Sequence, residues 1–138
     1  MPRVRRTVDR LGLASHVELP GYVDHAALPA VLAHSAIFVV PSRREALSIA
    51  AIEARSAGLP VVARVPSGVS EVVTHGRHGL LARSDAEIVD ALATLCADRA
   101  LRLRLAAHAR RDLDRFAWSR SIARHEQIYA LALERGAR

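Results

Sequence analysis

Residues 36–63 read AIFVVPSRREALSIAAIEARSAGLPVVA, and the architecture follows from this segment. An apolar run over 36–40 is followed by a polar turn, a helical pattern over 45–57 and a second apolar run over 60–64. That order predicts a strand–helix–strand unit whose polar groups gather where the first strand ends. In open α/β sheets ligands bind at the carboxyl ends of strands, and a helix that starts there presents unpaired N–H groups to an anion.

The remainder of the chain alternates between the same two kinds of element. Helices alternating with short apolar strands predict a parallel sheet with right-handed crossovers, so the fold class is α/β and doubly wound. At 138 residues the chain is expected to form a single domain, 1–138. We expect helices over 3–13, 26–34 (capped by Asp24 and interrupted by Pro29), 67–75, about 99–115 and 118–135, with further strands over 16–20 and 79–82. A further helix is capped by Asp85, and its apolar face is Ile88, Val89, Leu92 and Leu95.

Composition excludes several classes of protein. No apolar run approaches the roughly 20 residues of a membrane span, and no signal peptide opens the chain. Cys96 is the one cysteine, so no internal disulfide is expected and a reducing cytoplasm suits the chain. We interpret Cys96 as a small core residue and Trp118 and Tyr129 as packing residues of the closing helix.

The net charge of +6 comes from arginine, because the sequence contains no lysine. A basic balance favours anionic partners without choosing among them. The arginine-rich run over 102–115 is interpreted as a solvated helix face rather than as a binding patch. One alternative function is therefore a non-catalytic α/β module that binds nucleic acid or an acidic partner. Its marker would be aromatic residues interleaved with arginine, and these are absent, so no nucleic-acid partner is expected.

Two carboxylates, Glu45 and Glu53, bracket the first turn of the predicted helix 45–57. If the helix starts just after Glu45, they lie about 12 Å apart along its axis, too far to share a proton or grip one metal ion. They suit hydrogen bonds to hydroxyl groups along an extended ligand, and the N–H groups between them favour a diphosphate. This order of parts matches a nucleotide-diphosphate sugar. The spacing alone leaves open that Glu45 is a first-turn acid and Glu53 a solvated residue.

The combined motifs resemble a known family. They resemble the retaining glycosyltransferases of the GT-B fold, and more narrowly the large bacterial group 1 family that includes mannosyl- and glucosyltransferases. The likeness covers nearly the whole chain. It rests on Val17-x-Leu19-x-Gly21, Pro41-Ser42-x-x-Glu45, Glu53-Ala54, Ala57-Gly58-Leu59-Pro60-Val61-Val62-Ala63, Ser67-Gly68-x-x-Glu71-Val72-Val73, Gly76-x-x-Gly79-Leu80-Leu81 and Phe116-Ala117-Trp118.

This resemblance implies a Rossmann-like, C-terminal donor-binding domain, with closing helices over about 99–138. Glu45 would be the catalytic residue that holds hydroxyls of the transferred sugar, and Glu53 would hold the nucleotide ribose. The substrate would be a nucleotide-diphosphate sugar, a hexose would be transferred with retention in glycan or glycolipid synthesis, and neither metal nor another cofactor is expected. A GT-B sugar-nucleotide epimerase is an alternative that the two-glutamate motif disfavours. The other residues implied to bind the donor are Arg44, Ala46, Leu47, Ser48, Ile49, Gly21 and Val23.

Some features depart from the family pattern. Residues 46–48 are Ala-Leu-Ser where the family usually has Gly-Phe-Gly, Ser67 replaces a usual glycine, and Arg55 stands where methionine is common. The resemblance also begins partway into the donor domain, without two strands, their basic loop or the acceptor-binding domain. We therefore expect this chain to be part of a longer enzyme and to be inactive in sugar transfer alone. The missing acceptor domain would be its partner, and a lipid acceptor would bring it to the inner face of the membrane.

A metal site is a weaker candidate. Glu71, His75 and His78 have a spacing that can suggest zinc, but they straddle a glycine-containing turn. We interpret this segment as a solvated turn rather than as a metal site.

Overall fold

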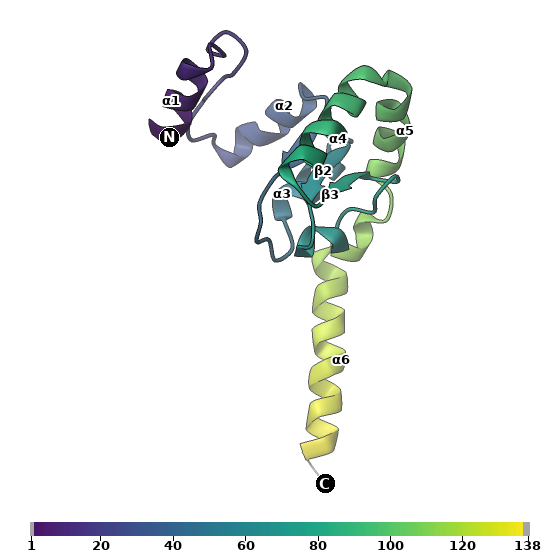
Figure 1. Cartoon of the computed structure of the whole chain (residues 1–138). Coiled ribbons are helices and arrows are strands. Elements are labelled where there is room, and N and C mark those ends of the chain that lie inside the picture. Colours follow the sequence, from purple (N-terminus) through teal and green to yellow (C-terminus); the bar gives the residue numbers. More distant parts are fainter. Residues whose placement is uncertain (1, 137–138) are drawn as a thin grey trace. The chain divides into compact units, whose positions relative to one another are not determined.

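The computed structural model describes residues 2–136, which divide into two compact units, one ending at His34 and the other beginning at Ser35. Figure 1 shows the elements along the chain. The two units are described separately below.

The N-terminal unit contains three short helical elements. Helix α1 (Pro2–Arg10) ends before Gly12, whose φ of +67° is the left-handed conformation that glycine adopts readily. The predicted helix 26–34 is divided into a 3₁₀ turn, η1 (His25–Ala27), and helix α2 (Leu28–Ala33), because Pro29 starts a new helix. The Asp24 carboxylate caps η1 by accepting from the N–H of Ala26 at 2.8 Å, as the sequence predicts.

The predicted strand over 16–20 is wrong for the described chain. These residues have no strand conformation, and within residues 2–136 the only strand that pairs with β1 is β2. An alternating pattern makes a strand only when a neighbour supplies main-chain partners, and this segment has no such neighbour in the part of the chain described.

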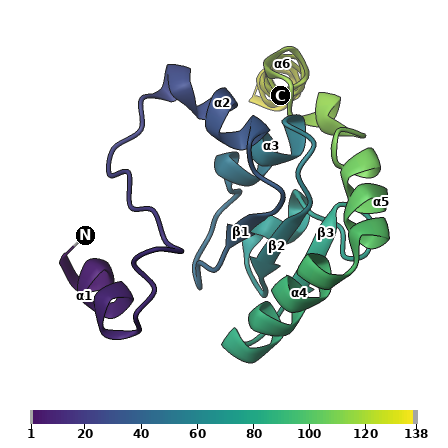
Figure 2. The same ribbon diagram turned by 90° about the horizontal axis from the view of Figure 1, so that it is seen from above.

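The C-terminal unit is built on a parallel three-stranded sheet. Its strands are β1 (Phe38–Val40), β2 (Val61–Arg64) and β3 (Gly79–Ala82), arranged in the order β1-β2-β3. Helix α3 (Ile49–Ser56) connects β1 to β2 and lies on one face of the sheet, whereas α4 (Asp85–Ala97) covers the other face (Figure 2). All four residues of β2 are buried, which explains why it is apolar at every position except Arg64, and helices on both faces of a parallel sheet confirm the doubly wound α/β prediction.

The core lies between the sheet, α4 and α5 (Arg99–Ala109). Val62 and Ala82 pack there with Ile88, Leu95 and Leu105. Of the predicted apolar face of α4, Ile88 and Leu95 are buried and Leu92 is half-buried, whereas Val89 is exposed, so the prediction is wrong for Val89. Cys96, predicted to be a core residue, is exposed.

Two predicted helices are shorter in the structure. The segment 67–75 forms only a 3₁₀ turn, η2 (Gly68–Glu71), and α5 ends at Ala109 before a second turn, η3 (Leu113–Phe116). Asp112 has φ +61°, a left-handed conformation that ends a helix, so the predicted continuous helix 99–115 is divided there.

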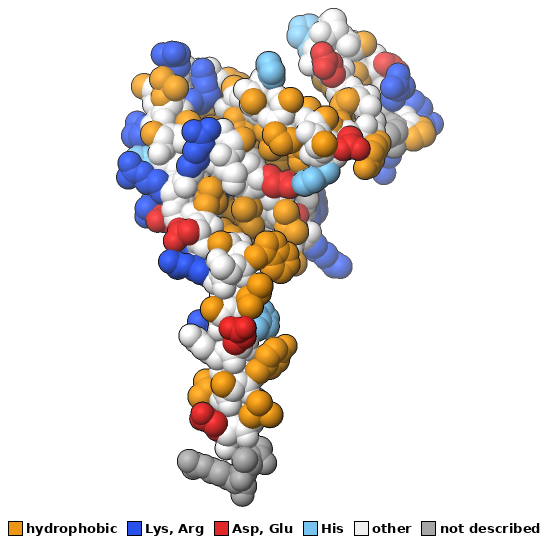
Figure 3. Space-filling model, turned by 180° about the vertical axis from the view of Figure 1, so that it is seen from behind, with side chains coloured by type: hydrophobic (Ala, Val, Ile, Leu, Met, Phe, Trp, Pro, Cys, Tyr) orange, Lys and Arg blue, Asp and Glu red, His pale blue; other side chains and the backbone are white. Residues whose placement is uncertain are grey.

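The closing helix α6 (Trp118–Gly136) carries exposed apolar side chains. Trp118 is 82% exposed and Tyr129 is 64% exposed, so the prediction that they are packing residues is wrong within the described chain. Figure 3 shows hydrophobic side chains along α6. No helix among the described residues is long and apolar enough to cross a membrane.

Arginine side chains hold the ends of several elements. Arg102 donates to the carbonyls of Leu95 and Cys96 at the end of α4, and Arg110 donates to Ser56 and Ala57 at the end of α3. Helix C-termini carry partial negative charge and unpaired carbonyls, which a guanidinium satisfies. Part of the 102–115 run is thus neither a plain solvated face nor a free binding patch.

Candidate functional site

The candidate site lies where the strands of the C-terminal unit end. The loop over 41–48 leaves the carboxyl end of β1, and it is held by the last residue of β2 and by a residue of the loop that follows β2. The N–H of Gly68 donates to the carbonyl of Glu45 at 2.8 Å, and Arg64 Nε donates to the carbonyl of Pro41 at 3.2 Å. The hydroxyl of Ser67 donates to the carbonyl of Arg64 at 2.7 Å, so the β2 loop is itself fixed.

Gly68 allows the closest approach between these two loops. A Cβ atom at this position would lie 1.6 Å from the carbonyl oxygen of Ala46 and 2.9 Å from that of Glu45. Atoms that are not bonded to each other cannot come so close. Only glycine therefore lets the backbone of residue 68 reach the Glu45 segment. The motif Ser67-Gly68 therefore fixes the main chain of the candidate catalytic residue.

Helix α3 begins at Ile49, four residues later than the sequence predicts. Ser48 precedes it as the N-cap with φ +62° and ψ +77°, a left-handed conformation that cannot continue an α-helix. The carbonyl of Ser48 accepts from the N–H of Ala51 at 3.0 Å and starts the helix. The N–H groups predicted to favour a diphosphate therefore do not all belong to the first turn of the helix. Ala46 to Ser48 belong to the loop, and Ile49 is the first helical residue.

Both glutamates are half-buried, but they belong to different elements. Glu45 lies in the loop and Glu53 lies inside α3, so their predicted separation along a single helix is wrong. Arg44 and Ile49 are exposed on the same segment, and Ser48 is buried. The structure therefore brings the predicted residues 44–53 into one loop-and-helix unit at the end of β1. Their proposed contacts with a donor stay predictions.

Gly21 and Val23 belong to the N-terminal unit, in the segment between α1 and η1. Gly21 has φ +78°, so the turn of the Pro-Gly pair needs a glycine there. Their predicted role in framing a base stays a prediction.

Arg55 is a residue whose importance the sequence does not reveal. Its side chain is fully buried, and it donates to the carbonyls of Ala109 at 3.0 Å, Arg111 at 2.6 Å and Val72. Burial, and after it the charge of Arg115, lowers the pKa of the Arg55 guanidinium, while Asp112 raises it. Arg55 thus joins α3 to the end of α5 and to η2. The signal in the sequence is an arginine beside Ala51 and Ala54, on the apolar side of the helical pattern.

The prediction of a solvated turn is wrong for His78, because its side chain is buried. It is 2% exposed, and its Nδ1 accepts from the N–H of Thr74 at 3.2 Å, so Nε2 carries the hydrogen in the neutral ring. That Nε2 is buried without a hydrogen-bond partner, 3.9 Å from a carboxylate oxygen of Asp112. Burial first, and then the charges of Arg55 and Arg77, lowers the pKa of His78 to about 4. No three metal-binding side chains gather within residues 2–136.

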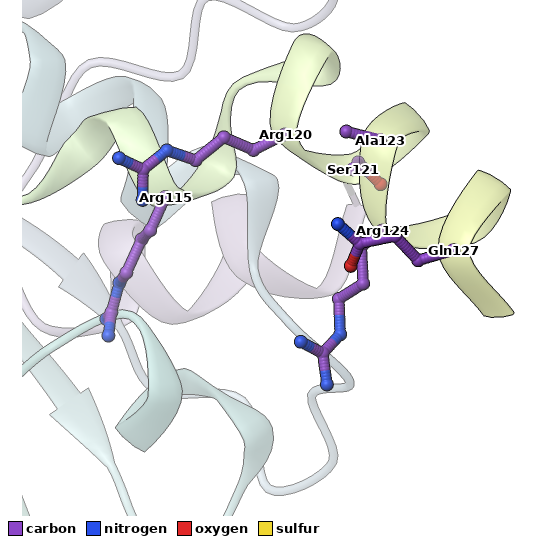
Figure 4. A pocket seen from close by; sticks show the side chains of 6 residues that line it. All are labelled: Arg115, Arg120, Ser121, Ala123, Arg124 and Gln127. Atoms are coloured by element: carbon purple, nitrogen blue, oxygen red, sulfur yellow. The ribbon is translucent and has the colours of Figure 1, made fainter.

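A cavity of about 450 Å³ is lined by none of the residues 41–53. Figure 4 shows its lining, which comes from η3 and α6 and contains three arginines. Two of these have partners already, since Arg115 donates to the carbonyl of Glu71 and Arg120 pairs with Asp114 at 3.1 Å. The candidate donor site therefore rests on the arrangement of the 41–53 segment rather than on this cavity.

Comparison with known proteins identifies the family of this chain. The family described as glycosyl transferases group 1 matches residues 3–112. A D-inositol 3-phosphate glycosyltransferase of Xylanimonas cellulosilytica is 37% identical over 101 residues, which cover 72% of this chain and 24% of the relative. Another from Streptomyces bingchenggensis is 30% identical over 133 residues, covering 95% of this chain and 29% of the relative.

Solved structures are also similar to this chain. Sucrose-phosphate synthase of Thermosynechococcus elongatus superposes with a TM-score of 0.86 at 26% identity, covering 96% of this chain and 34% of that protein. HepE of Anabaena, solved in complex with UDP-glucose, has a TM-score of 0.75 at 25% identity over 83% of this chain and 32% of its own. The chain thus spans about a quarter to a third of the length of these proteins.

Proposed function

Because the chain belongs to the group 1 glycosyltransferases, we propose that it is the donor-binding part of an enzyme that transfers a sugar from a nucleotide diphosphate. The observation that carries this proposal is the placement of Glu45 and Glu53 on either side of the start of α3, at the carboxyl end of a parallel strand. Carboxylates there accept from hydroxyl groups, and the helix start favours the diphosphate between them.

Each part of the donor has its own group of residues in this proposal. Glu45 accepts from hydroxyls of the transferred hexose, and Glu53 accepts from the ribose. The amides of Ala46, Leu47, Ser48 and Ile49 face the phosphates or sugar, and Arg44 adds positive charge beside them. UDP-glucose bound to the related HepE supports a nucleotide sugar as the ligand class.

The proposed reaction proceeds with retention of the anomeric configuration and without a metal ion. The bond between the anomeric carbon and the diphosphate oxygen breaks, and the sugar develops oxocarbenium character. The N-terminus of α3 stabilises the charge that grows on the departing diphosphate. An acceptor hydroxyl attacks from the face that the diphosphate leaves. We place the acceptor site in the remainder of a longer protein, which acts in the cytoplasm and meets a lipid acceptor at the membrane.

Calorimetric titration of the chain with UDP, GDP and ADP tests this proposal and identifies the base. We expect saturable binding of one of them that changes little between 50 and 200 mM salt, because a pocket of hydroxyl acceptors and amides makes few purely ionic contacts. A nucleic-acid module would instead bind DNA and lose about 10³-fold or more of its affinity over that range. Binding of no nucleotide, together with salt-sensitive DNA binding, would reject the transferase proposal.

A further inference from the structure

Arg64, the last residue of β2, contacts the ends of all three strands. Its Nε donates to the carbonyl of Pro41, which follows β1, and its Nη1 donates at 3.1 Å to the carbonyl of Arg83, which follows β3. Its Nη2 pairs with the carboxylate of Asp85 at the start of α4. One guanidinium thus holds the β1, β2 and β3 loops together at the edge of the sheet where the donor is proposed to bind.

The geometry shows that Arg64 acts on these loops rather than directly on a ligand. Its side chain is only 10% exposed, and each of its three nitrogens already has an acceptor. A second arginine, Arg43 in the 41–48 loop, lies 3.5 Å from the other carboxylate oxygen of Asp85. Asp85 therefore balances the charge of Arg64 and adds a second, exposed link to the same loop.

We propose that Arg64 is a positioning residue that fixes the loop over 41–48 so that Glu45 meets the sugar of the donor. This inference rests on the proposed function. The loop is held at Pro41 by Arg64 and at Glu45 by Gly68. Without Arg64, the first hold is lost and the three residues between Pro41 and Glu45 gain freedom.

Loss of this hold affects the two ends of the donor unequally. Glu53 lies in α3, whose residues Ala51, Ala54 and Arg55 are buried, so the ribose contact does not depend on the 41–48 loop. Glu45 lies in that loop. Removing Arg64 should therefore weaken binding of the nucleotide sugar more than binding of the nucleotide, which keeps its ribose contact. A residue with only a general structural role would weaken both ligands together.

The test compares Arg64→Met with Arg102→Met in the chain as it stands. Arg102 is a matched control because it also donates to two main-chain carbonyls, but at the end of α4. Each protein is titrated with UDP and UDP-glucose, or with GDP and GDP-mannose if the wild type prefers guanine. We expect Arg64→Met to lose about tenfold in the preference for the nucleotide sugar over the nucleotide, the equivalent of about one hydrogen bond. Arg102→Met should keep the wild-type ratio.

A second measurement needs no ligand. Arg43 and Arg44 are exposed trypsin sites within the loop, and we expect Arg64→Met to be cut there several-fold faster than Arg102→Met, as followed by mass spectrometry. Arg64→Lys keeps a positive charge opposite Asp85 and should restore part of the ligand preference, and it replaces Arg64→Met if that variant does not fold.

The outcomes separate the two proposals. A wild-type protein that binds neither ligand overturns the proposed function. A wild-type protein that prefers the nucleotide sugar, beside an Arg64→Met variant with the same preference and the same rate of cutting, overturns the positioning role alone.

Discussion

Replacing the buried Arg55 by methionine, the residue common at this place in the family, should destabilise the fold strongly. The change removes the three guanidinium nitrogens, each of which donates to one carbonyl, that of Ala109, Arg111 or Val72. Methionine fills similar space but donates no hydrogen bond, so two buried acceptors and one part-buried acceptor lose their partner.

The expected magnitude follows from two opposing contributions. Leaving a buried carbonyl without its hydrogen bond costs about 1–3 kcal/mol, so three together cost several kcal/mol. Part of this cost is offset, because the variant no longer buries a charged guanidinium. The desolvation of that guanidinium is also what lowers the pKa of Arg55. We estimate a net loss of about 3 kcal/mol in the free energy of unfolding, or roughly 10 °C in Tm for a domain of this size.

Urea unfolding followed by circular dichroism measures this loss, with Arg102→Met as the control. Arg102 is only half-buried at the end of α4, so its loss should cost about 1 kcal/mol. Equal stability of Arg55→Met and the wild type would refute the reasoning. It would mean that the desolvation cost of the guanidinium cancels its three hydrogen bonds.

Three further predictions concern single positions. The pKa of His78 is lowered from 6.5 to about 4, so the folded state should lose up to about 3 kcal/mol as the pH falls from 6.5 towards 4, a loss that urea titrations of His78→Asn should lack in that window. Gly68→Ala forces a Cβ against the Ala46 carbonyl and should cost more than about 2 kcal/mol in urea unfolding, whereas Gly76→Ala, with open space but φ +74°, should cost about 1. Ser48→Gly should change Tm by only a few degrees because glycine suits its left-handed backbone, whereas Ser48→Val should lower Tm by clearly more.

The sheet was predictable because its signals are local. The β2 segment is apolar at every position except Arg64, and β1 and β3 are short apolar runs bounded by glycine, proline or polar residues. Continuous apolar runs between helical patterns are what a buried parallel strand needs. The family resemblance agreed with this and is confirmed by the match over residues 3–112. The alternatives of a binding module and an epimerase receive no such support.

The start of α3 could not be placed from helical periodicity. The pattern of 45–57 continues through Glu45, but the left-handed backbone of Ser48 stops the helix there. The family's usual glycine at this position was the available signal, because a glycine suggests a positive φ. The contacts of Gly68 and Arg64 with the same loop join residues about 20 positions apart, and no local pattern predicts them.

Burial of polar residues was also beyond the sequence. Arg55 is buried because carbonyl groups distant in the sequence accept its hydrogen bonds, and none of them lies within its own motif. His78 is buried although its ring bonds only to the nearby N–H of Thr74 and its Nε2 has no partner among the described residues. Trp118 and Tyr129 show the reverse error, since apolar spacing on a helix predicts packing but does not supply the surface to pack against. The roles of the two glutamates in binding a donor remain a prediction.

The most direct test of the account is a paired calorimetric titration of Glu45→Gln and Glu53→Gln. Each variant is titrated with UDP and UDP-glucose, or with the guanine or adenine pair if the wild type prefers it. We predict that Glu53→Gln weakens the nucleotide and the nucleotide sugar alike by about tenfold, because both carry the ribose. Glu45→Gln should weaken only the nucleotide sugar. Unchanged affinities in both variants, with a wild type that binds, would contradict the claim that these carboxylates hold the donor.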